Sequence, residues 1–335
     1  MSVDLYHRWS EFLIDSLSLE VENVREFETK KIIYISGMGG SGIVGEYVAR
    51  IVDEHFTKRF LVISKRSSDI TNQVLELGRE TFFIIVSYSG NTAETLRVFR
   101  KLTSKRLDIG VVTSGGVLGR EAARDRLPMV IVRSGLIPRV SFPYLLVAVL
   151  KLIGLLGVNI DSILTMFKDT ANIIRSFDSY AEDLSEKLFE AVRAGDRIVI
   201  VSSERYEPLV ERFIAEYAEN SKILLHRAVF PEAGHNIVET LRSAKTTLLY
   251  IEDSSDLENQ VIEGFLQRLR EREENIRIVR LELPANRSYL EKILVGTYIA
   301  GLSSSHLAER LEISPVETPS IKLYRDYVSE FYLTH

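Results

Sequence analysis

The chain of 335 residues contains no cysteine and one tryptophan, and its glutamines are confined to Gln73, Gln260 and Gln267. Without cysteine, the protein can form no disulfide, thiolate metal site, iron–sulfur cluster or cysteine nucleophile. Its one long apolar stretch, at 144–158, contains Lys151 and is shorter than the roughly 20 residues of a membrane-spanning helix. That stretch therefore predicts a buried helix and no membrane contact.

The chain also lacks an excess of positive charge, because its 42 lysines and arginines are outnumbered by 47 acidic residues, for a net charge of −5 at pH 7. No basic field draws the chain to nucleic acid or anionic lipid, so neither is an expected partner, and an anionic ligand must be held by local donors. The N-terminus is charged and lacks the apolar segment of a secretion signal, which favours a cytoplasmic location.

Short β-branched runs alternate with helical patterns along the chain. Five runs precede a polar helical connector at about 161–195, and four follow it: 31–36, 59–64, 81–87, 108–114 and 128–134, then 197–203, 222–230, 246–252 and 276–283. Strands that are apolar on both faces and spaced by helices indicate a parallel sheet covered by helices on both faces. The chain is therefore predicted to hold two similar α/β halves.

We expect three segments from this pattern and from a chain length typical of about two domains. Residues 1–155 form a first α/β domain with an N-terminal helix, and 156–300 form a second one with the helical connector. Residues 301–335 form a C-terminal segment with helical patterning on both sides of a proline-containing turn, and it is expected to pack across the two domains.

A glycine-rich turn, 36–42, lies between the first expected strand and the helix after it. Such a turn brings backbone N–H groups and a helix N-terminus to an anion, although small residues are also needed in any tight strand–helix turn. A dinucleotide site is a third alternative. It favours an acidic residue after the second strand, whereas Lys65 and Arg66 stand there, which argues against NAD and leaves NADP open.

A second hydroxyl-rich turn, 87–92, follows the third expected strand. Loops after neighbouring parallel strands open on the same edge of a sheet, where ligands bind in such folds. Hydroxyls and backbone amides without a lysine suit a phosphate monoester. The alternative is a capping turn with Asn91 or Thr92 as the helix N-cap. No glycine loop continues into Gly-Lys-Ser/Thr, so hydrolysis of nucleoside triphosphates is not expected.

These two turns, GMGGSGIVGE at 37–46 and SYSGNTAETL at 87–96, resemble the phosphosugar-binding SIS domain. Further motifs are similar to those of the archaeal-type bifunctional phosphoglucose/phosphomannose isomerase family, over about residues 20–335. They are Thr113-Ser114-Gly115-Gly116, Ile137-Pro138-Arg139, Glu219-Asn220 and the Pro-Glu-x-x-His-Asn sequence at 231–236. The resemblance implies two flavodoxin-like domains, each a parallel sheet with helices on both faces, and a C-terminal helical segment.

The resemblance also implies an activity, the interconversion of glucose 6-phosphate and mannose 6-phosphate with fructose 6-phosphate through a cis-enediol. Glu219 would move the proton between C1 and C2, Arg139 would stabilise the enediolate, and His235 would open the sugar ring. In a family homodimer, His235 is expected to come from the partner subunit. The residues implied to hold the substrate phosphate are Gly39, Gly40, Ser41, Ser87, Ser89 and Thr92.

Isomerisation of an aldose to a ketose independently requires these residue types. It needs a carboxylate base, a cation near the developing oxyanion, and an acid/base group for the ring oxygen. Rotation about C2–C3 of a planar enediol would let one carboxylate accept either C2 epimer. Each candidate also has a plain structural alternative: Glu219 as a solvated acid on an acidic helix, Arg139 as an ion-pair anchor, and His235 as an ordinary loop residue.

Two departures from the family pattern concern the ring-opening step. Ile237 and Val238 stand before Glu239, where the family usually carries an acid soon after His-Asn. The family's C-terminal lysine corresponds to Lys322 in one register and to Arg325 in another, counted from Thr318. Arginine would keep the charge but could not exchange a proton.

No metal or cofactor is expected, since the six histidines form neither HxH nor HExxH. A non-catalytic phosphosugar-binding regulator built on the same fold is the alternative function. The absence of cysteine and the scarcity of glutamine predict thermal adaptation.

Overall fold

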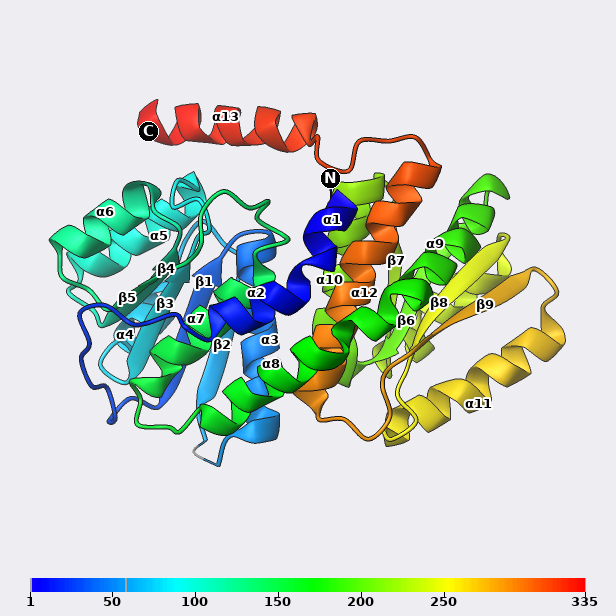
Figure 1. Ribbon diagram of the computed structural model, residues 1–335, viewed down its shortest axis with the longest axis horizontal. Coiled ribbons are helices and arrows are strands. Elements are labelled where there is room, and N and C mark those ends of the chain that lie inside the picture. Colours follow the sequence, from blue (N-terminus) through cyan, green and yellow to red (C-terminus); the bar gives the residue numbers. More distant parts are fainter. Residues whose placement is uncertain (1, 58, 335) are drawn as a thin grey trace. The chain divides into compact units, whose positions relative to one another are not determined.

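The computed structural model describes residues 2–57 and 59–334 (Figure 1). Contacts divide this chain into two units, each discontinuous in sequence. The five-stranded unit comprises residues 10–171 and 318–334, and the four-stranded unit comprises residues 2–9 and 172–317. The domain boundaries expected from the sequence, at 155 and 300, stay a prediction.

The five-stranded unit is an all-parallel sheet with the order β2-β1-β3-β4-β5. Its strands are β1 (Ile32–Gly37), β2 (Leu61–Lys65), β3 (Thr81–Val86), β4 (Ile109–Thr113) and β5 (Met129–Ile131). Each of the five apolar runs overlaps its strand, with β1 and β2 ending one residue beyond their runs, and β1 and β3 are buried along their whole length. Burial on both faces is why β1 and β3 are largely apolar and show no alternation of apolar and polar residues.

Helices cover both faces of this sheet, as predicted. The helices of this unit are α2 (Trp9–Ser16), α3 (Gly40–His55), α4 (Asn72–Glu76), α5 (Ala93–Ser104), α6 (Gly116–Arg124), α7 (Phe142–Gly154), α8 (Asp161–Ile173) and α13 (Pro319–Thr334). α3 packs with α7, and α5 packs with both α6 and α13. The apolar stretch at 144–158 contains most of α7, which is buried almost throughout. No helix among the described residues is long and apolar enough to cross a membrane.

The four-stranded unit repeats the same winding, with the all-parallel order β7-β6-β8-β9. Its strands are β6 (Arg197–Ser203), β7 (His226–Phe230), β8 (Thr246–Glu252) and β9 (Ile276–Glu282). This order matches β2-β1-β3-β4, which confirms two halves of one architecture. The run at 222–230 was too long as a strand, because Lys222 has a left-handed φ of 58° and ends the preceding helical segment.

The helices of this unit are α1 (Ser2–His7), α9 (Asp178–Arg193), α10 (Glu207–Glu216), α11 (Leu257–Arg272) and α12 (Tyr289–Arg310). Short 3₁₀ segments are η1 (Ile174–Phe177), η2 (Glu204–Tyr206), η4 (Glu232–His235) and η5 (Ile237–Arg242), and η3 (Tyr217–Ser221) is a π-helical turn. α12 packs with α1, α9, α10 and η3, whereas α11 packs with side chains of β6 and β8.

Candidate functional site

The two loops predicted to hold phosphate leave neighbouring strands of the five-stranded unit. Gly39, Gly40 and Ser41 follow β1, and residues 87–92 follow β3. The sheet order places β1 beside β3, with β2 on one side and β4 on the other. This is the topological switch point of the sheet, and ligands of open α/β folds bind there, at the carboxyl ends of the strands.

Side chains do not cap the two helices that begin at these loops. In the described chain, α3 has Gly39 as N-cap and α5 has Thr92, and neither makes a side-chain hydrogen bond to its own helix. The Thr92 hydroxyl instead accepts from Ser87 Oγ at 3.3 Å. Asn91 Oδ1 accepts from the N–H of Val117 in α6. Thr92 is thus the N-cap of α5 by position, as in the capping-turn alternative, but its hydroxyl does not cap the helix, which leaves the first-turn N–H groups of α5 without a side-chain partner.

The two loops are joined to one another by a hydrogen bond. Ser41 Oγ accepts from the N–H of Tyr88 at 3.2 Å, so the Ser41 hydroxyl lies against the second loop. Ser41 and Ser87 are both buried. Together with Thr92, they bring three hydroxyls to one edge of the sheet, which is the arrangement expected for a phosphate held by dipoles and hydroxyls.

A third loop, 113–116, holds the second one in place. The N–H of Ser114 donates to the Tyr88 carbonyl at 2.9 Å, and Ser114 Oγ donates to the same oxygen at 2.7 Å. Gly90 and Gly116 both have positive φ, and a Cβ on Gly90 would lie 1.9 Å from the carbonyl oxygen of Gly115. Only glycine allows this approach of two backbones. The motif at 113–116 thus supports the loop at 87–92.

Arg139 lies in the turn before α7, and its side chain is 4% exposed. The segment that leads to it is fastened to the phosphate loops by Tyr88, whose hydroxyl donates to the carbonyl of Arg133 at 3.0 Å and accepts from the N–H of Leu136 at 2.8 Å. Burial raises the pKa of Tyr88, which keeps the hydroxyl protonated and able to donate. Nothing in the sequence around Tyr88 indicates this role.

Glu219 lies in the π-helical turn η3 of the four-stranded unit and is half-buried. Single π-helical turns within helical segments are frequently found at functional sites, and η3 continues directly from α10. Lys222 closes the turn, since its Nζ donates to the Glu219 carbonyl at 2.6 Å and to the Ser314 carbonyl at 2.9 Å. The burial is greater than expected for a solvated acid on a helix surface.

His235 ends the short segment η4, after β7, and is exposed. It lines a cavity of about 720 Å³, together with Glu204, Arg227 and Phe230 among others, and Glu219 is not among the lining residues. Asn236 shapes this turn, because its Nδ2 donates to Glu232 Oε1 at 2.6 Å. An exposed imidazole at the rim of a cavity is accessible for proton transfer.

The comparisons with known proteins agree with this geometry. Residues 26–125 match the SIS domain, and residues 177–328 match the bacterial phospho-glucose isomerase C-terminal SIS domain. The bifunctional phosphoglucose/phosphomannose isomerase of Aeropyrum pernix is 28% identical over 98% of this chain and 98% of its own length. The D-glucosamine-6-phosphate 4-epimerase of Sulfolobus acidocaldarius is 30% identical over 96% of this chain and 96% of its own length.

The chain belongs to the bifunctional phosphoglucose/phosphomannose isomerase family. Its fold is also similar to that of the C-terminal domain of glucosamine-fructose-6-phosphate aminotransferase from Francisella tularensis. That likeness has a TM-score of 0.68 at 15% sequence identity, and covers 92% of this chain and 95% of the other.

In this isomerase-family chain, the switch point of the second sheet already contains negative charge. Between β6 and β8, Ser203 Oγ donates to Asp256 Oδ2 at 2.6 Å, and Asp256 caps α11 by accepting from the N–H of Glu258. Beside them, Asp253 forms a buried ion pair of 2.7 Å with Lys292. Carboxylates there repel a phosphate, so the hydroxyl-lined switch point of the five-stranded unit is the better phosphate site.

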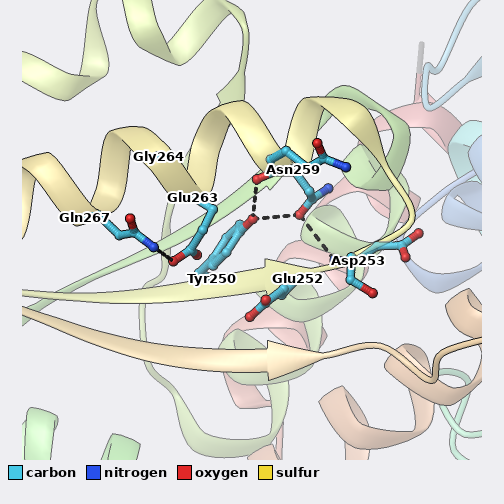
Figure 2. A pocket seen from close by; sticks show the side chains of 9 residues that line it. Tyr250, Glu252, Asp253, Asn259, Glu263, Gly264 and Gln267 are labelled. Atoms are coloured by element: carbon cyan, nitrogen blue, oxygen red, sulfur yellow. Dashed lines mark hydrogen bonds between the residues drawn. The ribbon is translucent and has the colours of Figure 1, made fainter.

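The same acidic edge borders a cavity of about 370 Å³ between the end of β8 and α11 (Figure 2). Tyr250 donates to Asn259, which also accepts from the N–H of Asp253, as the dashed lines show. Burial opposes ionisation of Asp253, but hydrogen bonds from Lys292, Tyr206 and Ser255 outweigh it and lower the pKa to about 2. The polar groups of Tyr250, Asn259 and Asp253 thus have hydrogen-bond partners within the protein.

The remaining candidates from the isomerase-family resemblance lie on α13 in the five-stranded unit. Lys322 and Arg325 are both exposed, and Lys322 Nζ lies 2.6 Å from Asp326 Oδ2 on the same helix. Lys65 and Arg66 are the basic pair that left an NADP site open. Of these two, Arg66 forms an ion pair of 2.6 Å with Glu46 of α3. Among the described residues, no group of three or more His, Asp or Glu could hold a metal ion.

Proposed function

We propose that this chain interconverts glucose 6-phosphate and mannose 6-phosphate with fructose 6-phosphate through a cis-enediol. The observation that carries the proposal is the hydroxyl-lined switch point with two helix N-termini free of side-chain caps, in a chain of this isomerase family. The proposed phosphate ligands are the backbone amides of Gly39 and Gly40 and the side chains of Ser41, Ser87, Ser89 and Thr92.

The proposed chemistry uses a carboxylate, a guanidinium and an imidazole. Glu219 removes the proton from C2 of the open-chain aldose and returns it to C1, while Arg139 stabilises the enediolate oxygen. His235 opens the ring by moving a proton to and from the ring oxygen, with Lys322 as its cationic helper. No metal takes part in this scheme, so EDTA should leave activity intact, and a loss of activity that zinc restores would overturn this part.

The decisive assay follows the conversion of fructose 6-phosphate to glucose and mannose 6-phosphates by wild type and Glu219→Gln. Loss of a positioned base lowers kcat by about 10²–10⁴. Glu211→Gln is the matched control, because Glu211 is an acid of the same helical segment that pairs with Arg227 at 2.8 Å. Full activity of Glu219→Gln would remove Glu219 as the base, and binding of sugar phosphate without turnover by wild type would favour a regulator.

The choice between Lys322 and Arg325 is tested by Lys322→Met and Arg325→Met. We expect Lys322→Met to lower kcat/KM by at least about tenfold, and Arg325→Met to stay near wild type, because only lysine exchanges a proton readily. The reverse result would transfer the role to Arg325.

We further propose a cytoplasmic homodimer in which His235 serves the site of the partner subunit. Equal mixing of Glu219→Gln and His235→Ala chains gives half heterodimers, and each has one site with both groups intact. Such a mixture should regain about a quarter of wild-type activity, whereas sites contained in one subunit would regain none.

A second candidate substrate is D-glucosamine 6-phosphate. It is favoured by the 30% identity to the Sulfolobus acidocaldarius D-glucosamine-6-phosphate 4-epimerase. Incubation with D-glucosamine 6-phosphate, followed by proton NMR of the C4 configuration, separates the two candidates. Epimerisation at C4 without conversion of fructose 6-phosphate would replace the isomerase proposal.

A further inference from the structure

A fully buried polar cluster lies directly before the turn that carries Glu219. Arg212 and Glu216 form an ion pair whose side chains are 1% and 0% exposed. Glu216 Oε2 accepts two more hydrogen bonds, from the Tyr6 hydroxyl at 2.6 Å and from Asn220 Nδ2 at 3.0 Å. The acidic run that the sequence presents as a solvated helix face therefore has one of its carboxylates in the protein interior.

Burying such a pair is a costly way to stabilise a fold. Removing each ion from water costs several kcal/mol, and buried pairs are often no more stabilising than apolar residues of similar size. Stability alone is therefore a weak explanation for Glu216. Its hydrogen bond to Asn220, the residue after Glu219, points to control of the turn.

The other side of the turn is fixed to α12 in the same way. Asn220 Nδ2 also donates to Ser304 Oγ at 2.8 Å, and the Tyr217 hydroxyl shares a hydrogen bond of 2.7 Å with Ser303 Oγ. Tyr217 and Asn220 are both completely buried. The buried residues before and after Glu219 are thus held on one helix, while Glu219 itself is half-buried.

The first helix of the chain supplies one donor of this cluster. α1 packs along α12 (Figure 1), and Ser2 Oγ and Ser305 Oγ lie 3.0 Å apart. Gly301 makes room for the Tyr6 ring, since a Cβ at this position would lie 2.0 Å from Tyr6 Cε1. The absence of a side chain at Gly301 lets the Tyr6 hydroxyl reach Glu216.

We propose that Tyr6, Glu216 and Asn220 are positioning residues that aim the Glu219 carboxylate, an inference that rests on the proposed role of Glu219 as the base. Hydrogen bonds on both sides of the turn hold the Glu219 backbone in its π-helical geometry. A misplacement of about 1 Å in a catalytic group can cost up to about 10² in rate. Substitutions in the cluster should therefore lower the rate of proton transfer by Glu219. They should leave the affinity for the substrate phosphate unchanged, because the loops proposed to hold the phosphate belong to the five-stranded unit.

The mildest test is Tyr6→Phe, which keeps the buried ring and removes one donor to Glu216. We expect kcat to fall about tenfold with KM within about twofold of wild type. The isotope effect with glucose 6-phosphate deuterated at C2, measured in the direction of fructose 6-phosphate, should rise, because proton abstraction becomes more rate-limiting. Tyr298→Phe is the matched control, since Tyr298 is a buried tyrosine of the same unit whose hydroxyl donates to Asp178. It should lower stability and leave kcat and the isotope effect unchanged.

A double-mutant cycle shows whether the cluster acts through Glu219. Asn220→Ala should lower kcat strongly in wild type and far less in Glu219→Asp, where the carboxylate is already displaced. Additive losses, or wild-type kcat in both Tyr6→Phe and Asn220→Ala while Glu219→Gln is inactive, would overturn the inference alone. Full activity of Glu219→Gln would instead remove the proposed base, and this inference with it.

Discussion

The hydroxyl of Tyr88 donates a hydrogen bond of 3.0 Å to the backbone carbonyl of Arg133. Through its backbone, the same residue contacts Ser41 and Ser114. One residue thus joins the loops after β1, β3, β4 and β5, including the segment that leads to Arg139. The loops predicted to hold phosphate and the segment that leads to the buried Arg139 are therefore joined through one residue.

Tyr88→Phe tests this dependence, because it keeps the ring and removes only the hydroxyl. Two partly buried backbone groups, the Arg133 carbonyl and the Leu136 N–H, then lose their partner, at a cost of about 0.5–1.5 kcal/mol in the free energy of unfolding. We expect a lower melting midpoint and a kcat reduced about tenfold, measured in the fructose 6-phosphate assay. Unchanged kcat would show that Arg139 keeps its place without this hydroxyl.

Gly90→Ala and Gly264→Ala form a matched pair of glycine substitutions. At Gly90, the new Cβ meets the Gly115 carbonyl oxygen at 1.9 Å and the φ is positive, so the loop must move. At Gly264, within α11, a Cβ meets nothing within 4 Å. We expect Gly90→Ala to raise KM at least tenfold, and Gly264→Ala to stabilise the protein by about 0.5–1 kcal/mol in urea unfolding. A wild-type KM for Gly90→Ala would contradict the tight contact of the two loops.

Asp253 predicts a specific dependence of stability on pH. Its pKa of about 2 lies below its ordinary value of 3.8, so its contribution is present above about pH 4 and is lost as the pH falls through 2. The shift corresponds to about 1–2 kcal/mol after allowance for solvent screening. Asp253→Asn should therefore destabilise the protein more at pH 6 than at pH 2.5, as measured by urea unfolding at both values. An equal effect at both would show that Asp253 titrates normally in the fold.

Thermal adaptation is predicted from the missing cysteine and the scarce glutamine. We expect a melting midpoint above the range of about 45–65 °C that is typical of proteins from mesophiles. Differential scanning calorimetry at neutral pH measures it, and a midpoint inside that range would reject the prediction.

The strands could be predicted from the sequence because their burial on both faces leaves an unbroken apolar signature, as in β1 and β3. The position of the two loops at the edge of the sheet could be predicted because glycine and hydroxyl residues follow those strands directly, whereas their role in holding phosphate stays a prediction. The residues that hold the candidate site in place, such as Tyr6 and Glu216, could not be predicted, because their role depends on contacts between residues far apart in the sequence. Tyr6 and Glu216 are 210 positions apart, and nothing local distinguishes the buried Glu216 from the partly exposed Glu211.

The membership of α1 in the four-stranded unit has a consequence for how the chain is made. Residues 2–7 are synthesised long before α12, yet they pack on that helix. During translation, the hydroxyl of Tyr6 can therefore donate to Glu216 only after Glu216 and Gly301 have both been synthesised. A fragment that begins at residue 172 lacks this helix altogether. Reattaching residues 1–9 through a linker after residue 317, as a circular permutant, would restore the missing donor.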